Sequence, residues 1–166
     1  MLTCLFEDGG SGFLRHCTVG SILLNKERDA ILLVRRAQKL SEGGKLAFPG
    51  GYMDRNETLA QTALREAREE TGYVVEIREL FRINDNPNRP REDRQNVDFI
   101  FIAQVIHRES SPDSEVSELV WHPLRDKLND DEIAFDHAET ISLYKAYMKK
   151  SFALPIISHS LSIKNI

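Results

Sequence analysis

The amino-acid sequence predicts a single α+β domain, and three observations support this fold class. The chain has 166 residues, which suits one domain and allows a core to form without disulfide cross-links. Several short segments are rich in apolar and β-branched residues, as β-strands are. Two longer segments repeat apolar residues with the spacing of an amphipathic helix.

The strand-like segments are separated by polar or glycine-rich turns. Strands are expected at residues 16–24, 30–36, 46–48, 73–82, 97–106 and 119–122. The first two flank a polar turn and are expected to form a hairpin. The third ends at the turn Pro49-Gly50-Gly51. The segment 97–106 is almost continuously apolar, so it is expected to lie at the centre of the sheet.

The clearest helix is predicted between Thr58 and Gly72. Thr58 and Gln61 have the spacing of a capping box, and Gly72 stands where a helix often ends on a glycine. The apolar stripe expected to face the core consists of Ala60, Ala63, Leu64 and Ala67. A second helix is expected from Asp136, as its N-cap, to about residue 150, with an apolar face of Ile141, Tyr144 and Met148.

The predicted elements divide the chain into a leader, a domain and a tail. Residues 1–13 are expected to be a loose leader or a short edge element, residues 14–150 the folded domain, and residues 151–166 a C-terminal tail. Residues 84–96 are polar and are expected to form an exposed loop, and residues 109–118 a polar, acidic loop. Long loops without secondary structure often bind something.

Composition and charge exclude several classes of protein. Lys and Arg number 22 against 26 for Asp and Glu, giving a net charge of −4, which disfavours a protein that coats nucleic acid. The sequence has no apolar run long enough to span a membrane and no visible secretory signal, so a cytoplasmic location is expected. A small phosphorylated ligand fits this composition, because a local site does not need a basic protein.

The first helix gathers acidic residues at a helical spacing. Glu66, Glu69 and Glu70 fall on one patch of the helix surface, and Glu57 lies in the turn before it. The three helix acids are expected to repel one another, so a divalent cation would stabilise them, and Glu69 and Glu70 are expected to be exposed. All-oxygen ligands without His or Cys favour Mg²⁺, with Mn²⁺ as a substitute. The alternative to a metal site is a solvated, charged helix face on which Arg65 pairs with Glu69.

From Gly51 the chain reads GYMDRNETLAQTALREAREETGY, which resembles the Nudix box. Residues at seven fixed positions match the box: Gly51, Glu57, Arg65, Glu66, Glu69, Glu70 and Gly72. The departures are Ala67 and Tyr73, which stand at two positions where the box has bulky apolar residues.

The resemblance implies a Nudix-type α/β/α sandwich with a mixed β-sheet and a loop–helix–loop metal site. It also implies Mg²⁺-dependent hydrolysis of a nucleoside diphosphate linked to another moiety. The metal ligands carried over are Gly51, Glu57, Glu66, Glu69 and Glu70, with Arg65 orienting the acids. The catalytic base is left open between the helix acids Glu69 and Glu70 and a loop acid, Glu115 or Glu118.

Arginines outside the box are candidates for substrate binding, because guanidinium groups bind phosphate in a bidentate manner. These candidates are Arg35, Arg36, Arg89, Arg91 and Arg94. Arg35 and Arg36 alternate at a strand end, so one of them is expected to face the site. The alternative for the loop arginines is an exposed loop of mixed charge.

Two substrate classes and one non-enzymatic role remain as alternatives at this stage. Pro87 lies near the place where the ADP-ribose branch of the family has a proline, so ADP-ribose or a dinucleotide is favoured. The alternative is hydrolysis of nucleoside triphosphates to sanitise the nucleotide pool, and a non-catalytic nucleotide sensor is a third hypothesis. A homodimer is possible by analogy with that branch.

Overall fold

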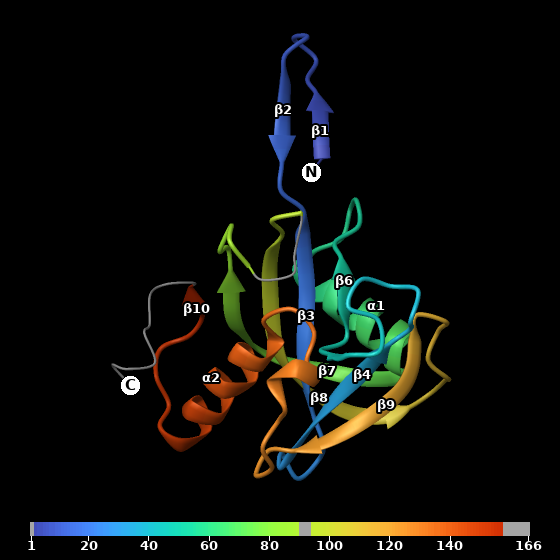
Figure 1. Cartoon of the computed structure of the whole chain (residues 1–166), viewed down its shortest axis with the longest axis vertical. Helices are drawn as coiled ribbons and strands as arrows, with labels where there is room; N and C mark the ends of the chain where they lie inside the picture. The colour runs from blue at the N-terminus through green and yellow to red at the C-terminus, as the bar shows by residue number, and fades with distance from the viewer. Residues whose placement is uncertain (1, 90–93, 158–166) are drawn as a thin grey trace.

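The computed structural model of the protein describes residues 2–89 and 94–157. A main sheet of eight strands lies between two helices, and a two-stranded hairpin extends from one end of it (Figure 1). The hairpin consists of β1 (Leu2–Leu5) and β2 (Ser11–Leu14). The main sheet contains β3 (Cys17–Leu24), β4 (Ala30–Arg36), β5 (Leu46–Ala47), β6 (Gly50–Tyr52), β7 (Tyr73–Asn84), β8 (Val97–Arg108), β9 (Val116–Pro123) and β10 (Ile156–Ile157). The helices are α1 (Leu59–Thr71) and α2 (His137–Lys149), and a 3₁₀ turn covers Asp130–Glu132.

The main sheet is mixed, with the strand order β10-β7-β8-β3-β4-β5. Strand β6 also pairs with β3, and β9 pairs with β4. The pairs β3–β8 and β7–β10 are parallel, and the other pairs are antiparallel. The α+β class and the central position of β8 are therefore confirmed.

The two helices cover opposite faces of the sheet, which makes the fold an α/β/α sandwich. Ile22 and Leu24 of β3 pack with Ile141 of α2, whereas Leu23 packs with Ala67 of α1. Neighbouring residues in a strand point to opposite faces, so this alternation places the helices on different sides. Strand β3 thus carries the core of both layers.

Several predicted elements differ from those in the structure. The turn at Gly50-Gly51 continues directly into strand β6, which pairs with Val19 and its neighbours on β3. The acidic loop is shorter than predicted because β9 begins at Val116. The first residues form a hairpin of their own, and Ile156, placed in the tail by the sequence, is buried in β10 beside β7.

The buried faces of the helices were also predicted only in part. Ala63 and Ala67 are buried, but Ala60 is exposed and 42% of Leu64 is accessible to solvent. On α2, Ile141 and Tyr144 are buried as expected, whereas Met148 is 50% exposed. Both helices are rotated relative to the predicted stripes, and on α1 this rotation turns acidic residues inward.

Most described residues of the segment 84–96 are exposed, as predicted, but three of its polar residues are buried. Asn84, Arg89 and Asn96 are each less than one tenth exposed. The Arg15 guanidinium donates to the backbone oxygens of Asp85 and Asn96, at 2.8 and 3.1 Å, and ties both ends of this loop to the end of β2. In the part of the chain that the structure describes, no helix is long and apolar enough to cross a membrane.

Candidate active site

The predicted caps hold helix α1 in place. Thr58 accepts a hydrogen bond from the Gln61 backbone, Gln61 reciprocates, and Gly72 ends the helix in the left-handed region with φ 73°. An added Cβ at Gly72 would lie 2.0 Å from the backbone oxygen of Ser110, so glycine is required there. The register of the helix against the following loop is therefore fixed at both ends.

Arg65 is the centre of an ion-pair network on the outer side of α1. Its Nε donates to Glu57 at 2.7 Å, and its Nη1 donates to Glu66 at 2.7 Å and to Glu69 at 3.1 Å. Its Nη2 also donates to the backbone oxygen of Tyr52 at 3.0 Å, joining the helix to β6. The hydrogen bond from Arg65 lowers the pKa of Glu57 to about 2, so Glu57 stays ionised. The predicted orienting role of Arg65 agrees with these contacts.

Glu66 and Glu70 point inward, toward the backbone of Gly50 and Gly51. The Gly50 N–H donates to Glu70 at 2.8 Å, and a Cβ added at Gly51 would lie 2.4 Å from a carboxylate oxygen of Glu66. Burial raises the pKa of Glu70 to about 8 and also raises the pKa of Glu66. The sequence expectation that Glu69 and Glu70 are exposed is wrong for Glu70, which is only 6% accessible.

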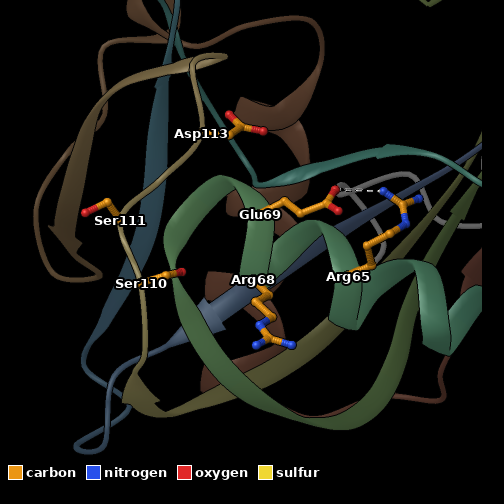
Figure 2. Close-up of a pocket in the computed structure, with 6 residues that line it drawn as sticks. All are labelled: Arg65, Arg68, Glu69, Ser110, Ser111 and Asp113. Atoms are coloured by element: carbon orange, nitrogen blue, oxygen red, sulfur yellow. Dashed lines mark hydrogen bonds and ion pairs between the residues drawn. The ribbon is translucent and has the colours of Figure 1, made fainter.

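The three helix acids do not converge as the helical wheel suggested. Among the described residues, no three His, Cys, Asp or Glu side chains are gathered in the manner of a metal site. Glu69 separates from the other two because its carboxylate points to Arg65, and its side chain is 52% exposed (Figure 2). Glu66 and Glu70 remain near each other, since the charge of Glu66 raises the pKa of Glu70.

The donor chemistry of Glu66 and Glu70 fits a hard divalent cation. Both groups are carboxylates whose burial disfavours the ionised form, and a bound Mg²⁺ or Mn²⁺ would offset that penalty. Negative charge on Glu115 raises the pKa of Glu66, and that on Asp113 raises the pKa of Glu70. The loop before β9 therefore adds negative charge, from Asp113 and Glu115, to the surroundings of Glu66 and Glu70.

The loop acids predicted as alternatives for the base occupy different surroundings. Glu115 lines a cavity beside Gly50 and Gly51, so its position agrees with the prediction. Glu118 lies in β9 and not in the loop, where its carboxylate accepts from Arg35 at 2.6 Å. Glu118 is already engaged by a cation and is a poor candidate for the base.

A cavity of about 900 Å³ opens beside the two glycines. Its walls come from β3, β6, β8, the residues after β4 and the start of α2. The lining residues include Thr18, Arg36, Phe48, Tyr52, Arg89, Arg94, Asp98, Glu115, Phe135 and His137. A cavity of this volume has the size of a small-molecule binding site.

The predicted substrate-binding arginines divide into three groups. Arg36 and Arg94 line the cavity and lie over the rings of Phe135 and Tyr52, with guanidinium carbons 5.2 and 5.6 Å from the ring centroids. Arg35 does not line the cavity, because it pairs with Glu118. As the alternation of Arg35 and Arg36 predicts, one of the two faces the site. Arg91 lies outside the described residues.

Arg89 forms the third group, since its side chain is buried in an ion-pair network. Only 4% of the side chain is exposed, and it contacts Asp136 at 2.7 Å and Asp98 at 3.5 Å. Asn84 also donates to Asp136, so the carboxylate of this N-cap residue serves the loop and makes no side-chain cap. Arg89 therefore pairs with carboxylates in the cavity wall, whereas it was predicted to bind phosphate.

A smaller cavity of about 500 Å³ lies on the outer side of α1, lined by Arg65, Arg68, Glu69, Ser110, Ser111 and Asp113. Figure 2 shows that Glu69 extends toward Arg65, whereas Arg68 extends away from it. Arg68 pairs with Glu109 at 3.2 Å. Neither cavity is lined by Glu66 or Glu70, but the larger one includes Gly50 and Gly51, which these carboxylates contact.

The sequence did not identify Asp98 and His137 as residues of the site. Asp98 is the only charged residue in the otherwise apolar segment 97–106, which is a detectable signal. The expected N-cap at Asp136 makes His137 the first residue of the second helix, and His137 is the first residue of α2. Its place in the cavity wall depends on the packing of α2 against Phe48, which no local pattern reveals.

Comparisons with known proteins identify one family over most of the chain. The NUDIX domain family matches residues 14–144. A relative from Methanocaldococcus jannaschii, named ADP-ribose pyrophosphatase, is 28% identical over 74% of this chain and 69% of its own length. The chain covers less than half the length of two further relatives, from Xenopus laevis and Caenorhabditis elegans.

Solved structures share the fold. A NUDIX hydrolase from Nitrosomonas europaea matches with a TM-score of 0.67 and 27% identity, over 90% of this chain and 80% of that chain. An ADP-ribose pyrophosphatase from Streptococcus suis matches with a TM-score of 0.67 and 21% identity, over 87% of this chain and all of that one.

Proposed function

The chain belongs to the NUDIX family, hydrolases that cleave pyrophosphate bonds in nucleotide derivatives, and we propose that its substrate is ADP-ribose and its cofactor Mg²⁺. One observation carries the proposal: the buried carboxylate of Glu70 and the partly buried one of Glu66 meet the Gly50-Gly51 backbone beside a cavity of small-molecule size. The name of the relative from Methanocaldococcus jannaschii supports the choice of substrate.

Glu66 and Glu70 are the residues proposed to hold the cation. Of the other predicted ligands, Glu57 has both carboxylate oxygens occupied by Arg65 and Thr62, and Glu69 is 52% exposed and lines the smaller cavity. Glu66 also accepts from Arg65, through Oε1, but it lies against Gly51. Gly51 contributes by leaving room for the Glu66 carboxylate. When bound, Mg²⁺ supplies positive charge that neutralises the phosphate oxygens and favours ionisation of the attacking water.

Glu115 is the proposed catalytic base, because it lines the cavity and lies near enough to Glu66 for its charge to raise the pKa of Glu66. In this proposal its carboxylate accepts the proton from the water that attacks phosphorus. The bond from that phosphorus to the bridging oxygen then breaks, and AMP and ribose 5-phosphate leave. Arg36 and Arg94, which line the same cavity, are placed to bind the phosphate oxygens.

The test is hydrolysis of ADP-ribose by the purified full chain, with and without Mg²⁺ or Mn²⁺, with the products separated by chromatography. We expect AMP and ribose 5-phosphate to appear only when the metal is present. Release of pyrophosphate from nucleoside triphosphates, with ADP-ribose untouched, would replace this substrate by the alternative class. An absence of hydrolysis of either class with both metals would contradict the enzymatic proposal.

A further inference from the structure

Two polar side chains in the wall of the larger cavity have no part in the proposed hydrolysis. Asp98 on β8 and His137 at the start of α2 line this cavity and are 6% and 8% exposed. The same cavity contains Gly50, Gly51 and Glu115, where the diphosphate is proposed to bind. Its volume of about 900 Å³ leaves space for the nucleoside that the diphosphate carries.

Asp98 presents a buried carboxylate with spare capacity to accept hydrogen bonds. Thr18 donates to its Oδ1 at 2.9 Å, and Arg89 approaches its Oδ2 at 3.5 Å. Arg89 makes its shorter contact with Asp136, at 2.7 Å, so its hydrogen bond to Asp98 is the weaker of the two. Each carboxylate oxygen accepts two hydrogen bonds, so Asp98 can accept another from a ligand in the cavity.

His137 presents a hydrogen-bond donor whose tautomer is fixed by the protein. The Phe48 N–H donates to its Nδ1 at 3.0 Å, so the ring hydrogen must be on Nε2. Burial lowers the pKa of His137 to about 3, and the ring is neutral at physiological pH. Within residues 2–89 and 94–157, Nε2 has no hydrogen-bond partner.

The surroundings of His137 are flat and aromatic. The rings of Phe48 and Phe135 lie 5.0 and 5.6 Å from the imidazole, centroid to centroid. Phe135 is in turn covered by Arg36. Planar surfaces of this kind favour a planar ligand over a sugar, because bases stack on aromatic rings and guanidinium groups.

We propose that Asp98 and His137 recognise the adenine base of the substrate, with Asp98 accepting from the exocyclic amine and His137 donating to a ring nitrogen. This inference rests on the proposed function for the identity of the nucleotide. Adenine presents an amine donor beside a ring-nitrogen acceptor, which complements an anionic acceptor and a neutral donor. Hypoxanthine replaces that amine with a carbonyl oxygen, which the Asp98 carboxylate repels.

The test compares the binding of AMP and IMP to the full chain by isothermal titration calorimetry. We expect the wild-type protein to bind AMP at least about tenfold more tightly than IMP, because IMP leaves a buried carboxylate facing an acceptor. In the Asp98→Asn variant, the side-chain amide can donate to the carbonyl oxygen, so the preference should shrink or reverse. Asp126→Asn, at an exposed turn residue, makes the same chemical change outside the cavity and should keep the wild-type ratio.

The wild-type comparison decides the matter even if Asp98→Asn fails to fold. Equal affinity for AMP and IMP, or no binding of either, would overturn the inference, as would a folded Asp98→Asn variant with the full preference. Because binding does not require hydrolysis, the two proposals fail separately. An AMP preference without ADP-ribose cleavage contradicts only the proposed function, and cleavage without a preference contradicts only the adenine contact.

Discussion

Glu57 lies just before helix α1 and Glu70 lies in its last turn, yet their pKa values are shifted in opposite directions. Glu57 accepts from Arg65, and that hydrogen bond lowers its pKa to about 2. Glu70 is buried, the Gly50 N–H is its one hydrogen-bond donor among the described residues, and burial raises its pKa to about 8. Within the described part of the chain, Glu57 thus pairs with a cation of the protein and Glu70 does not.

The difference separates the carboxylates that build the site from those that remain available for chemistry. Arg65 fixes α1 to β6 and to the turn before the helix, and the charge of Glu57 is satisfied there. Burial raises the pKa of Glu70, and it raises that of Glu66 although Glu66 also accepts from Arg65, which is typical of groups that meet a ligand or a metal. The larger cavity is lined by Gly50 and Gly51, which contact these two carboxylates.

The largest effect is expected for Glu70→Gln. The amide keeps the shape and the hydrogen bond from Gly50 but removes the charge that would hold the cation, so turnover should fall by about 100-fold or more. The free energy of unfolding without metal should stay equal or rise, because folding no longer has to bury a carboxyl group that is ionised in the unfolded chain. Steady-state hydrolysis and urea denaturation measure these two effects.

Glu76→Gln is the matched control, since Glu76 is exposed on β7 and pairs with Arg78. This variant should keep both activity and stability. Wild-type turnover in Glu70→Gln would show that Glu70 is not a metal ligand, and the contrast between Glu57 and Glu70 would then have no consequence for catalysis.

Arg65→Ala tests whether the ion-pair network around Arg65 stabilises the fold. It leaves Glu57, Glu66 and Glu69 without their shared cation, and the three carboxylates then repel one another. We expect a loss of about 1–3 kcal/mol in the free energy of unfolding, measured by urea denaturation. Arg65→Lys should recover only part of it, because an ammonium group cannot reproduce the planar contacts. An unchanged unfolding free energy in Arg65→Ala would contradict a structural role.

The pH dependence of metal-free stability tests the pKa of Glu70. The ordinary value of 4.5 applies in the unfolded chain and about 8 in the fold, so between these values the native state binds more protons. Stability should therefore fall as pH rises, by about 1.4 kcal/mol per pH unit for one such group. His137 changes stability in the opposite sense, but only below its ordinary pKa of 6.5, so the informative window is pH 6.5 to 8.

Thermal melts at several pH values within this window check the prediction. The Glu70→Gln variant should lack the slope, and Mg²⁺ should raise the melting temperature most at the upper end, where its ligands are ionised. A flat wild-type profile would mean that Glu70 is ionised throughout.

The parts of this site that depend on local sequence could be predicted, and those that depend on packing could not. The caps at Thr58 and Gly72 involve near neighbours in the chain, so the bounds of α1 followed directly from the sequence. The face that α1 buries depends on where the sheet lies. Ala60 and Leu64 seemed equivalent to Ala63 and Ala67 until the sheet was in place.

The same limit explains the errors in the loop after β7. The sequence around Arg89 is polar, and polarity alone suggests exposure. Asp98 and Asp136 come from β8 and from the start of α2, and together they make burial of the guanidinium tolerable. Such long-range pairs are set by topology, which the sequence gives only through the family it resembles.

The smallest effect is expected for Glu57→Gln, which alters the carboxylate that Arg65 neutralises. The variant replaces an ionised acceptor of Arg65 with a neutral one, so the melting temperature should fall by a few degrees, opposite in sign to Glu70→Gln. Because Glu57 stays ionised down to about pH 2 in the fold but only to about 4.5 when unfolded, its contribution is complete above pH 4.5 and is lost as pH falls toward 2. Melting curves of both variants at pH 7 without metal provide the measurement. Shifts of the same sign in the two variants would mean that these carboxylates do not differ in the way their surroundings imply.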